Sequence, residues 1–323
     1  MTSASQQATT PATRAAVASR PKHRREHRPV LGALALLEAV RLARHPVLLA
    51  ATGIGVLLTV QVLTDNSTQV STDALGLPLV ATSVGLGSML AAFYLTRSFH
   101  RADEIVEASP TSTTARTGAL CLTAVVPALV ASVWFVLYYG ARPAKVDAPE
   151  WMYGMFSHAD IAAVLVGHSV ISAVGATLLG VAAGRWWSFR GASAVLLLAV
   201  DAWTVGVLGF FSSGDDAPPE WFRWVRLLVP FGYFSSTTAD NSSVVSLTGS
   251  PRWYAVWLLT LCALAVVAAL LWRSEGATRR RVVRVGAVML ALSVLAYGLA
   301  VGGGLSHVVR TFPDGHSVVL VTR

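Results

Sequence analysis

The run LLEAVRLARHPVLLAATGIGVLL, residues 36–58, joins two kinds of helix and decides how the rest of the chain is organised. Apolar and charged residues recur at helical spacing in its first part, which predicts an amphipathic helix over residues 30–45 on a membrane surface. Its second part is apolar, and Pro46 suits the first turn of a new helix, where no backbone N–H is needed. We therefore expect a surface helix that turns into a membrane span.

The surface helix is expected to present two different faces. Its leucines should face the lipid, and its charged residues should face the cytosol. The leucine face comprises Leu31, Leu34, Leu37 and Leu42, and the charged face comprises Glu38, Arg41 and Arg44.

Seven apolar stretches occur along the chain, each of about 20 residues, the length with which an α-helix crosses ~30 Å of hydrocarbon. Hydrophobic residues make up 54% of the chain and charged residues only 13%, which is unlike a soluble domain. We expect an all-α, polytopic transmembrane helix bundle of about seven spans. The approximate spans are Val47–Leu63, Leu77–Leu95, Thr117–Tyr139, Ile161–Gly184, Ala192–Phe211, Trp253–Trp272 and Val285–Gly303.

Positive charge is sorted by side along the chain. If the N-terminus is cytoplasmic, most of the 25 Lys and Arg residues fall in cytoplasmic segments, which predicts the N-terminus inside and the C-terminus outside. Anchoring in the lipid bilayer explains the net charge of +8, so we expect no nucleic-acid partner. Lysine occurs only at Lys22 and Lys145, while Ala, Val and Gly abound, which suggests a bacterial plasma (inner) membrane.

The chain divides into five parts by composition. The first part is basic and lacks apolar periodicity, so it should be disordered. In the last part, Pro313, Asp314 and Gly315 make a turn between two β-rich runs, which predicts a hairpin. The parts are residues 1–29 (cytoplasmic tail), 30–45 (amphipathic helix), 46–272 (six-span core), 273–303 (cytoplasmic linker and seventh span) and 304–323 (extracytoplasmic tail).

Three segments together resemble the membrane subunits of bacterial type-2 ABC exporters. They are the opening run at residues 36–58, the loop RSFHRADEIVEASPTSTTARTGAL at 97–120, and WFRWVRLLVPFGYF at 221–234. The resemblance covers roughly residues 30–272. Members of this family have six spans and end inside, so the seventh span and outer tail of this chain suggest a fused or divided permease.

The resemblance implies a permease that moves its substrate by alternating access. A separate cytosolic ABC ATPase would supply the energy, and a second permease subunit, identical or related, would complete the pathway. The chain agrees with a separate motor, because it has no GxxxxGK[ST] loop with which to bind ATP phosphates. We expect no enzymatic activity and no cofactor in this chain.

The acidic loop between the second and third spans is expected to couple the ATPase to the permease. Asp103, Glu104 and Glu107 can share one helical arc, and Ile105 and Val106 would supply apolar contact. The docking role itself follows from the resemblance. The alternative is a solvated loop without a partner.

Two polar residues lie deep in predicted spans. Asp201 is near the membrane midplane, where a charge is costly, and His168 reaches a comparable depth. They could line a pathway for substrate or protons, or Asp201 could form a hydrogen bond that packs two helices. The first possibility allows a proton-coupled secondary transporter as an alternative function. A non-transporting membrane scaffold or immunity protein is a further alternative.

The segment before the sixth span is rich in aromatic and basic residues. Trp221, Arg223, Trp224 and Arg226 predict a helix at the outer interface, which either anchors the protein or closes the outer exit.

Several other residues are candidates for packing or metal binding. Gly180 and Gly184, like Gly298 and Gly302, have the spacing of close helix contacts. The cysteines Cys121 and Cys262 should be apolar packing residues, and we expect no metal site. The scattered tail residues His307, Asp314 and His316 are the nearest alternative to a metal-binding set.

Overall fold

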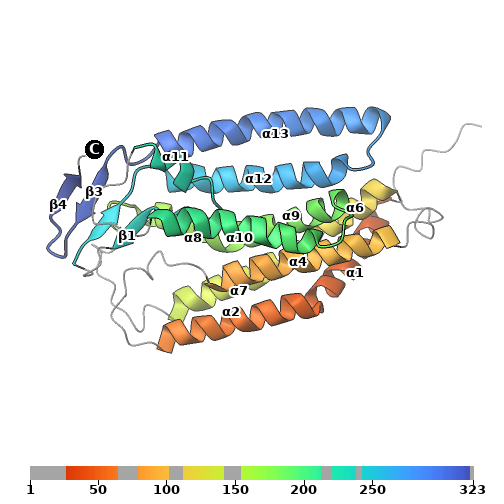
Figure 1. Ribbon diagram of the computed structural model, residues 1–323, viewed down its shortest axis with the longest axis horizontal. Coiled ribbons are helices and arrows are strands. Elements are labelled where there is room, and N and C mark those ends of the chain that lie inside the picture. The colour runs from red at the N-terminus through yellow and green to blue at the C-terminus, as the bar shows by residue number, and fades with distance from the viewer. Residues whose placement is uncertain are drawn as a thin grey trace, which may run out of the picture.

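The computed structural model describes residues 27–64, 79–101, 112–141, 154–211, 220–237 and 242–320. Most of these residues are helical, and Figure 1 shows long helices side by side with a small sheet at one end. The prediction of a helical bundle is therefore confirmed, and its long apolar helices agree with a membrane protein. Of the sheet, only the C-terminal hairpin was predicted.

The described helices follow one another in this order. They are α1 (His27–Ala43), α2 (Pro46–Thr64), α4 (Leu79–Arg101), α6 (Thr113–Leu122), α7 (Val125–Ala141), α8 (His158–Val166), the π-helix η2 (Gly167–Ile171), α9 (Ser172–Trp186), α10 (Ala192–Phe211), α11 (Phe222–Arg226), α12 (Pro251–Leu271) and α13 (Gly276–Gly302).

Four helical stretches in the described ranges are long and apolar enough to cross a membrane. The consecutive helices α1 and α2 make up to a fifth if they are counted as one bent span. A shorter apolar helix, Ala192–Val207, lies within α10. The four stretches are Thr113–Leu137, His158–Trp186, Pro251–Leu271 and Gly276–Gly302.

The predicted turn between the first two helices is confirmed. The first helix ends at Ala43 and the second begins at Pro46, and their axes differ by 56°. Proline is compatible with this position because the first residue of a helix needs no backbone donor. The imidazole Nδ1 of His45 also accepts a hydrogen bond from the Val47 N–H, at 3.3 Å, which holds the turn.

The predicted faces of α1 are wrong for two residues. Leu42 is fully buried in the bundle core, and Glu38 is only 4% exposed. The reason is that α1 packs against α6, so one face of the helix points into the protein. Glu38 accepts a hydrogen bond from the exposed Arg41, at 3.0 Å, which partly compensates the buried carboxylate.

Glycines bring α9 and α4 into close contact. A Cβ atom at Gly180 would lie 2.1 Å from the Met89 carbonyl oxygen, and one at Gly184 would lie 2.9 Å from the Thr96 side chain. The first glycine pair therefore has the predicted packing role. In contrast, a Cβ at Gly298 or Gly302 would meet no atom within 4 Å.

An antiparallel sheet covers one end of the bundle. Its strands are arranged in the order β1 (Ser235–Thr237), β2 (Val244–Ser246), β3 (Val308–Thr311) and β4 (Ser317–Leu320). The predicted hairpin is confirmed, since β3 pairs with β4 across a turn that contains Gly315 at φ +82°. The pairing of β2 with β3 was not predicted, and it joins the segment before α12 to the segment after α13.

Candidate functional site

The loop of residues 227–234 connects α11 to β1, and side chains from two long helices bind its backbone. The Tyr254 hydroxyl of α12 donates a hydrogen bond to the Val229 carbonyl (2.5 Å) and accepts one from the Gly232 N–H (2.9 Å). His168 of η2 lies 3.0 Å from the Gly232 carbonyl through its Nε2 atom. These contacts fix the 227–234 loop against the sheet end of the bundle.

The π-helix η2 lies directly beneath the 227–234 loop. At its end, the Ser172 hydroxyl donates a hydrogen bond to the Gly167 carbonyl five residues earlier (2.9 Å) and also contacts the Pro230 carbonyl of the loop (3.1 Å). The wider π turn is an interruption that often marks functional sites in helices. Here it places a buried histidine and a buried serine beneath the loop.

Aromatic rings fill the space around His168. Its ring lies edge-on to those of Phe231 and Tyr254, with centroids 6.0 Å apart in each case. Phe234 also packs edge-on against Tyr254, at 5.4 Å. The polar contacts are thus enclosed by apolar surface, which strengthens hydrogen bonds by excluding water.

Arg226, the last residue of α11, holds the other side of the loop. It is 1% exposed, and its guanidinium donates to the backbone carbonyls of Tyr233 and Thr248. It also lies over the Phe234 ring, 5.3 Å from the centroid. Burial lowers the pKa of Arg226 to about 10, so the group is still charged at neutral pH.

The other residues of the predicted outer helix have different positions. Trp221 and Trp224 are about half exposed, whereas Arg223 is only partly exposed. The Trp224 carbonyl accepts a hydrogen bond from the Tyr297 hydroxyl of α13. A short helix does lie in the predicted segment, and only Arg226 of the four residues points into the protein.

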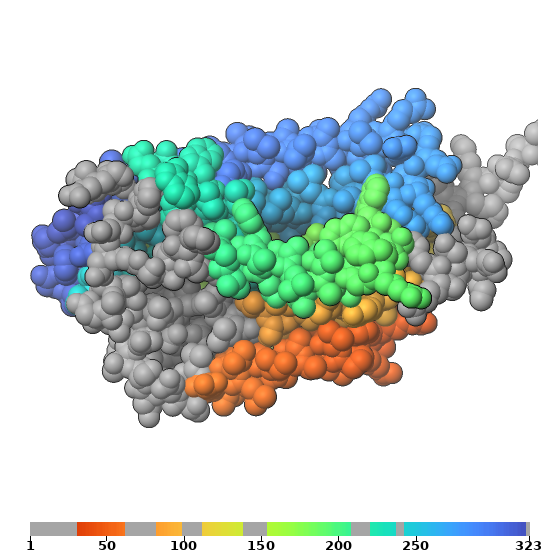
Figure 2. All heavy atoms as spheres, in the orientation of Figure 1, coloured from red at the N-terminus to blue at the C-terminus, as the bar shows by residue number. Residues whose placement is uncertain are grey.

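The structure does not join Asp201 to His168 by a hydrogen bond. His168 binds the Gly232 carbonyl instead, and Asp201 is partly exposed on α10. Among the described residues, Asp201 has no hydrogen bond or ion pair. Figure 2 shows α10 in green at the surface of the bundle, where it contacts α4.

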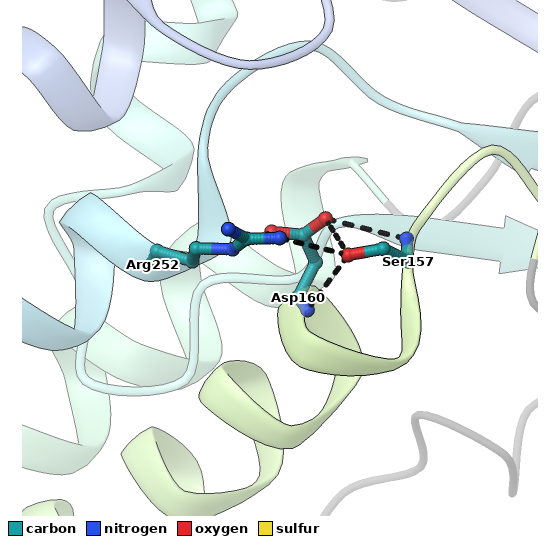
Figure 3. A network of polar contacts seen from close by, with 3 residues as sticks. All are labelled: Ser157, Asp160 and Arg252. Atoms are coloured by element: carbon teal, nitrogen blue, oxygen red, sulfur yellow. Dashed lines mark hydrogen bonds and ion pairs between the residues drawn. The ribbon is translucent and has the colours of Figure 1, made fainter.

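A polar network that sequence reasoning missed ties α8 to α12 (Figure 3). The Asp160 carboxylate accepts a hydrogen bond from Arg252 (2.8 Å) and a second from the Ser157 hydroxyl (2.5 Å). Arg252 also donates to the Ser157 hydroxyl, at 3.0 Å. Ser157 and Asp160 form a capping box at the start of α8. The serine and the acidic residue three positions later, before an apolar run, were the available signal.

The segment before α8 also contacts the sheet. The Met155 N–H donates to the Ser246 hydroxyl of β2 at 3.1 Å, and Phe156 packs edge-on against Phe234. Gly154 has a φ of +60°, and a Cβ there would lie 2.1 Å from the Ser246 hydroxyl oxygen. We call the sheet, α11 and the 227–234 loop the cap, since they cover the ends of α8 and α12 together.

The predicted coupling residues, Asp103 to Glu107, lie outside the described residues. The flanking structure is known on both sides. α4 ends at Arg101, and Ser112 caps α6 by accepting a hydrogen bond from the Ala115 N–H at 3.2 Å. The acidic segment therefore connects two helices that both pack in the bundle.

Within the part of the chain that the structure describes, no three His, Cys, Asp or Glu side chains are grouped so that they could hold a metal ion. In the β3–β4 turn, Asp314 accepts a hydrogen bond from the His316 N–H at 3.0 Å. The carboxylate thus has a turn-forming role. Both cysteines are buried and free, and Cys121 belongs to the main apolar core.

No protein-family model, curated protein or solved structure matches this chain.

Proposed function

We propose that this chain is the membrane-spanning permease subunit of an ABC exporter in a bacterial plasma membrane. The observation that supports it most is the packing of α1 against α6. The acidic segment that should receive the ATPase precedes α6 in the chain, so we expect a push on this segment to reach both the surface helix and the bundle. A separate ATPase and a second permease subunit, identical or related, complete the proposed transporter.

The proposal uses seven spans with the N-terminus inside. Besides the four stretches that satisfy length and hydropathy, α2, α4 and α10 would cross the membrane. α4 supports this reading because it packs between α2 and α9, although it ends in Arg97 and Arg101. The acidic segment is then cytoplasmic and the cap is extracytoplasmic.

In this arrangement the cap covers the exit. The cap contacts η2 through His168 and α12 through Tyr254, and the Asp160–Arg252 pair joins α8 directly to α12. Closure of the ATPase at the inner end would separate these helices at the outer end, and the cap would move with them. The third segment that resembles the exporter family, residues 221–234, forms part of this cap.

The proton-coupled alternative has less support. It needs Asp201 and His168 to share one pathway, and the His168 ring instead binds a backbone carbonyl. The scaffold alternative differs from the proposal in requiring no ATPase.

The test is purification of the chain from its native membrane in mild detergent, followed by mass spectrometry of bound proteins. We expect a stoichiometric ATPase with a Walker motif, lost in the double variant E104K/E107K because the acidic surface is reversed. The control is E275K, which reverses an exposed carboxylate at the start of α13. The proposal fails if the intact complex contains no ATPase, or if E275K releases it as readily as the loop variant.

A further inference from the structure

The beginning of α13 carries a dense group of positive charges. Arg279, Arg280, Arg281 and Arg284 are all exposed. Within the described ranges, none of the four side chains forms an ion pair or a hydrogen bond. Like charges at this spacing repel, and cations near the start of a helix oppose its dipole. Among the described residues the group therefore has no paired counter-charge, and it would gain one from an anionic ligand.

One face of α13 changes from basic to apolar within a single turn. Residues spaced by three and four positions share a helix face, so Arg281 and Arg284 begin a continuous stripe. The apolar residues that continue it are between 43% and 58% exposed: Val285, Val288, Leu292 and Leu295. We call these six residues the α13 stripe.

The position of the stripe along α13 matches a membrane boundary. The distance from Val285 to Gly302 is about 26 Å at 1.5 Å per residue, close to the thickness of the hydrocarbon layer. The arginines lie at the end of α13 opposite the sheet, since β3 follows its other end (Figure 1). Figure 2 shows this start of α13, in light blue, projecting at the edge of the molecule.

Aromatic residues at the same end of the bundle indicate an interface. The guanidinium groups of Arg273 and Arg185 lie 4.6 Å and 5.0 Å from the centroid of the Trp272 ring. Trp186 is half exposed and donates a hydrogen bond to the Ala268 carbonyl. Tryptophan is enriched at the level of lipid headgroups, so the arginines lie close to that level.

We propose that Arg281 and Arg284 bind the headgroup phosphate of an anionic phospholipid whose acyl chains lie along the α13 stripe. A soluble acidic protein would fit the arginines alone, because it could not follow the apolar residues into the membrane. A zwitterionic lipid carries a phosphate too, but its own cation opposes the arginines. The surface therefore distinguishes phospholipids by net charge.

The test is native mass spectrometry of the full chain in detergent, titrated with phosphatidylglycerol or with phosphatidylcholine. We expect the wild type to retain phosphatidylglycerol in preference to phosphatidylcholine. The variant R281Q/R284Q should retain about tenfold less phosphatidylglycerol, since each arginine makes its own contribution to the attraction of the anionic headgroup. The control R44Q/R190Q removes the same charge from exposed arginines outside α13 and should retain the lipid. R281K/R284K, which keeps the charge, should retain most of it.

Four results would overturn the proposal. The first is equal retention of the two lipids by the wild type, which does not depend on any variant folding. The second is equal loss of lipid in R281Q/R284Q and R44Q/R190Q, which indicates an effect of net charge alone. The third is displacement of phosphatidylglycerol by millimolar inorganic phosphate, which indicates an anion site without a lipid. If R281Q/R284Q instead loses a bound protein and keeps the lipid, the partner is an acidic protein and the lipid proposal is wrong.

Discussion

Tyr254 shows how much one hydroxyl group can do in this fold. It donates to one backbone group of the 227–234 loop and accepts from another, and the side chain is fully buried. The loop has no regular partner strand at these positions, so its polar backbone depends on side chains from the helices. Buried polar groups must be satisfied in this way to avoid a large desolvation cost.

The variant Y254F should therefore destabilise the protein by about 1–3 kcal/mol, because it leaves a buried N–H and a buried carbonyl unsatisfied. The measurement is thermal unfolding in detergent, followed by circular dichroism. The control is Y94F, which removes an exposed hydroxyl 3.2 Å from that of Ser193. A Y254F melting temperature equal to that of Y94F would contradict the role assigned to the loop contacts.

Gly180 illustrates a different residue-scale effect, the close approach of two backbones. The variant G180A places a methyl group against the Met89 carbonyl and should cost about 1–3 kcal/mol, as overpacked sites do. G298A is the matched control, because a Cβ there meets nothing within 4 Å. The same unfolding assay compares them, and an equal effect of the two substitutions would contradict the contact.

At the scale of single elements, the turn from α1 to α2 combines local and tertiary causes. Pro46 and the amphipathic pattern are local signals, and both helix boundaries were predictable from them. The burial of Glu38 is not local, because it depends on which face of α1 meets α6. A helical period identifies two faces but not the neighbours that each face will have.

Because of Glu38, the stability that the packing of α1 provides depends on pH. Burial raises the pKa of the Glu38 carboxyl above its ordinary value of 4.5, and Arg41 opposes this only in part. The protonated Glu38 carboxyl contributes its full stabilisation below the pKa that it has in the unfolded chain. This contribution is lost as the pH rises through the raised pKa of the folded protein. Above that pKa the protein buries a charged carboxylate.

The variant E38Q should therefore raise the melting temperature at neutral pH, relative to the wild type, and change it little at about pH 4. The measurement is a pair of unfolding curves at the two pH values. E275Q is the control, since Glu275 is exposed and should show no such difference. A stabilisation by E38Q that is larger at low pH would have the wrong sign for this account.

At the scale of the whole molecule, the sheet gives α13 a structural role. α13 brings β3 and β4 to the end of the bundle where β1 and β2 already lie, so that the segments before α12 and after α13 form one sheet. α13 thus completes the cap over α8 and α12. The C-terminal tail is a structural part of the cap.

The local hairpin was predictable because a Pro-Asp-Gly turn separates its two strands. The β2–β3 pairing was not, because Val244–Ser246 is only three residues long and its partner lies beyond two long helices. The contact of His168 with the Gly232 carbonyl could not be predicted either, because every residue has a backbone carbonyl and the sequence does not indicate which one accepts. Sequence patterns thus predicted the membrane helices and the first turn, but not which segments meet at their ends.

Sidedness is the central claim, because the proposed ATPase would have to meet the acidic segment on the side opposite the cap. Single cysteines can test it in intact cells with a membrane-impermeant maleimide, since the two native cysteines are buried. The account predicts that V318C on the exposed strand β4 is labelled from outside, and that E107C and R281C react only after the cells are permeabilised. Labelling of E107C in intact cells, or protection of V318C there, would contradict it.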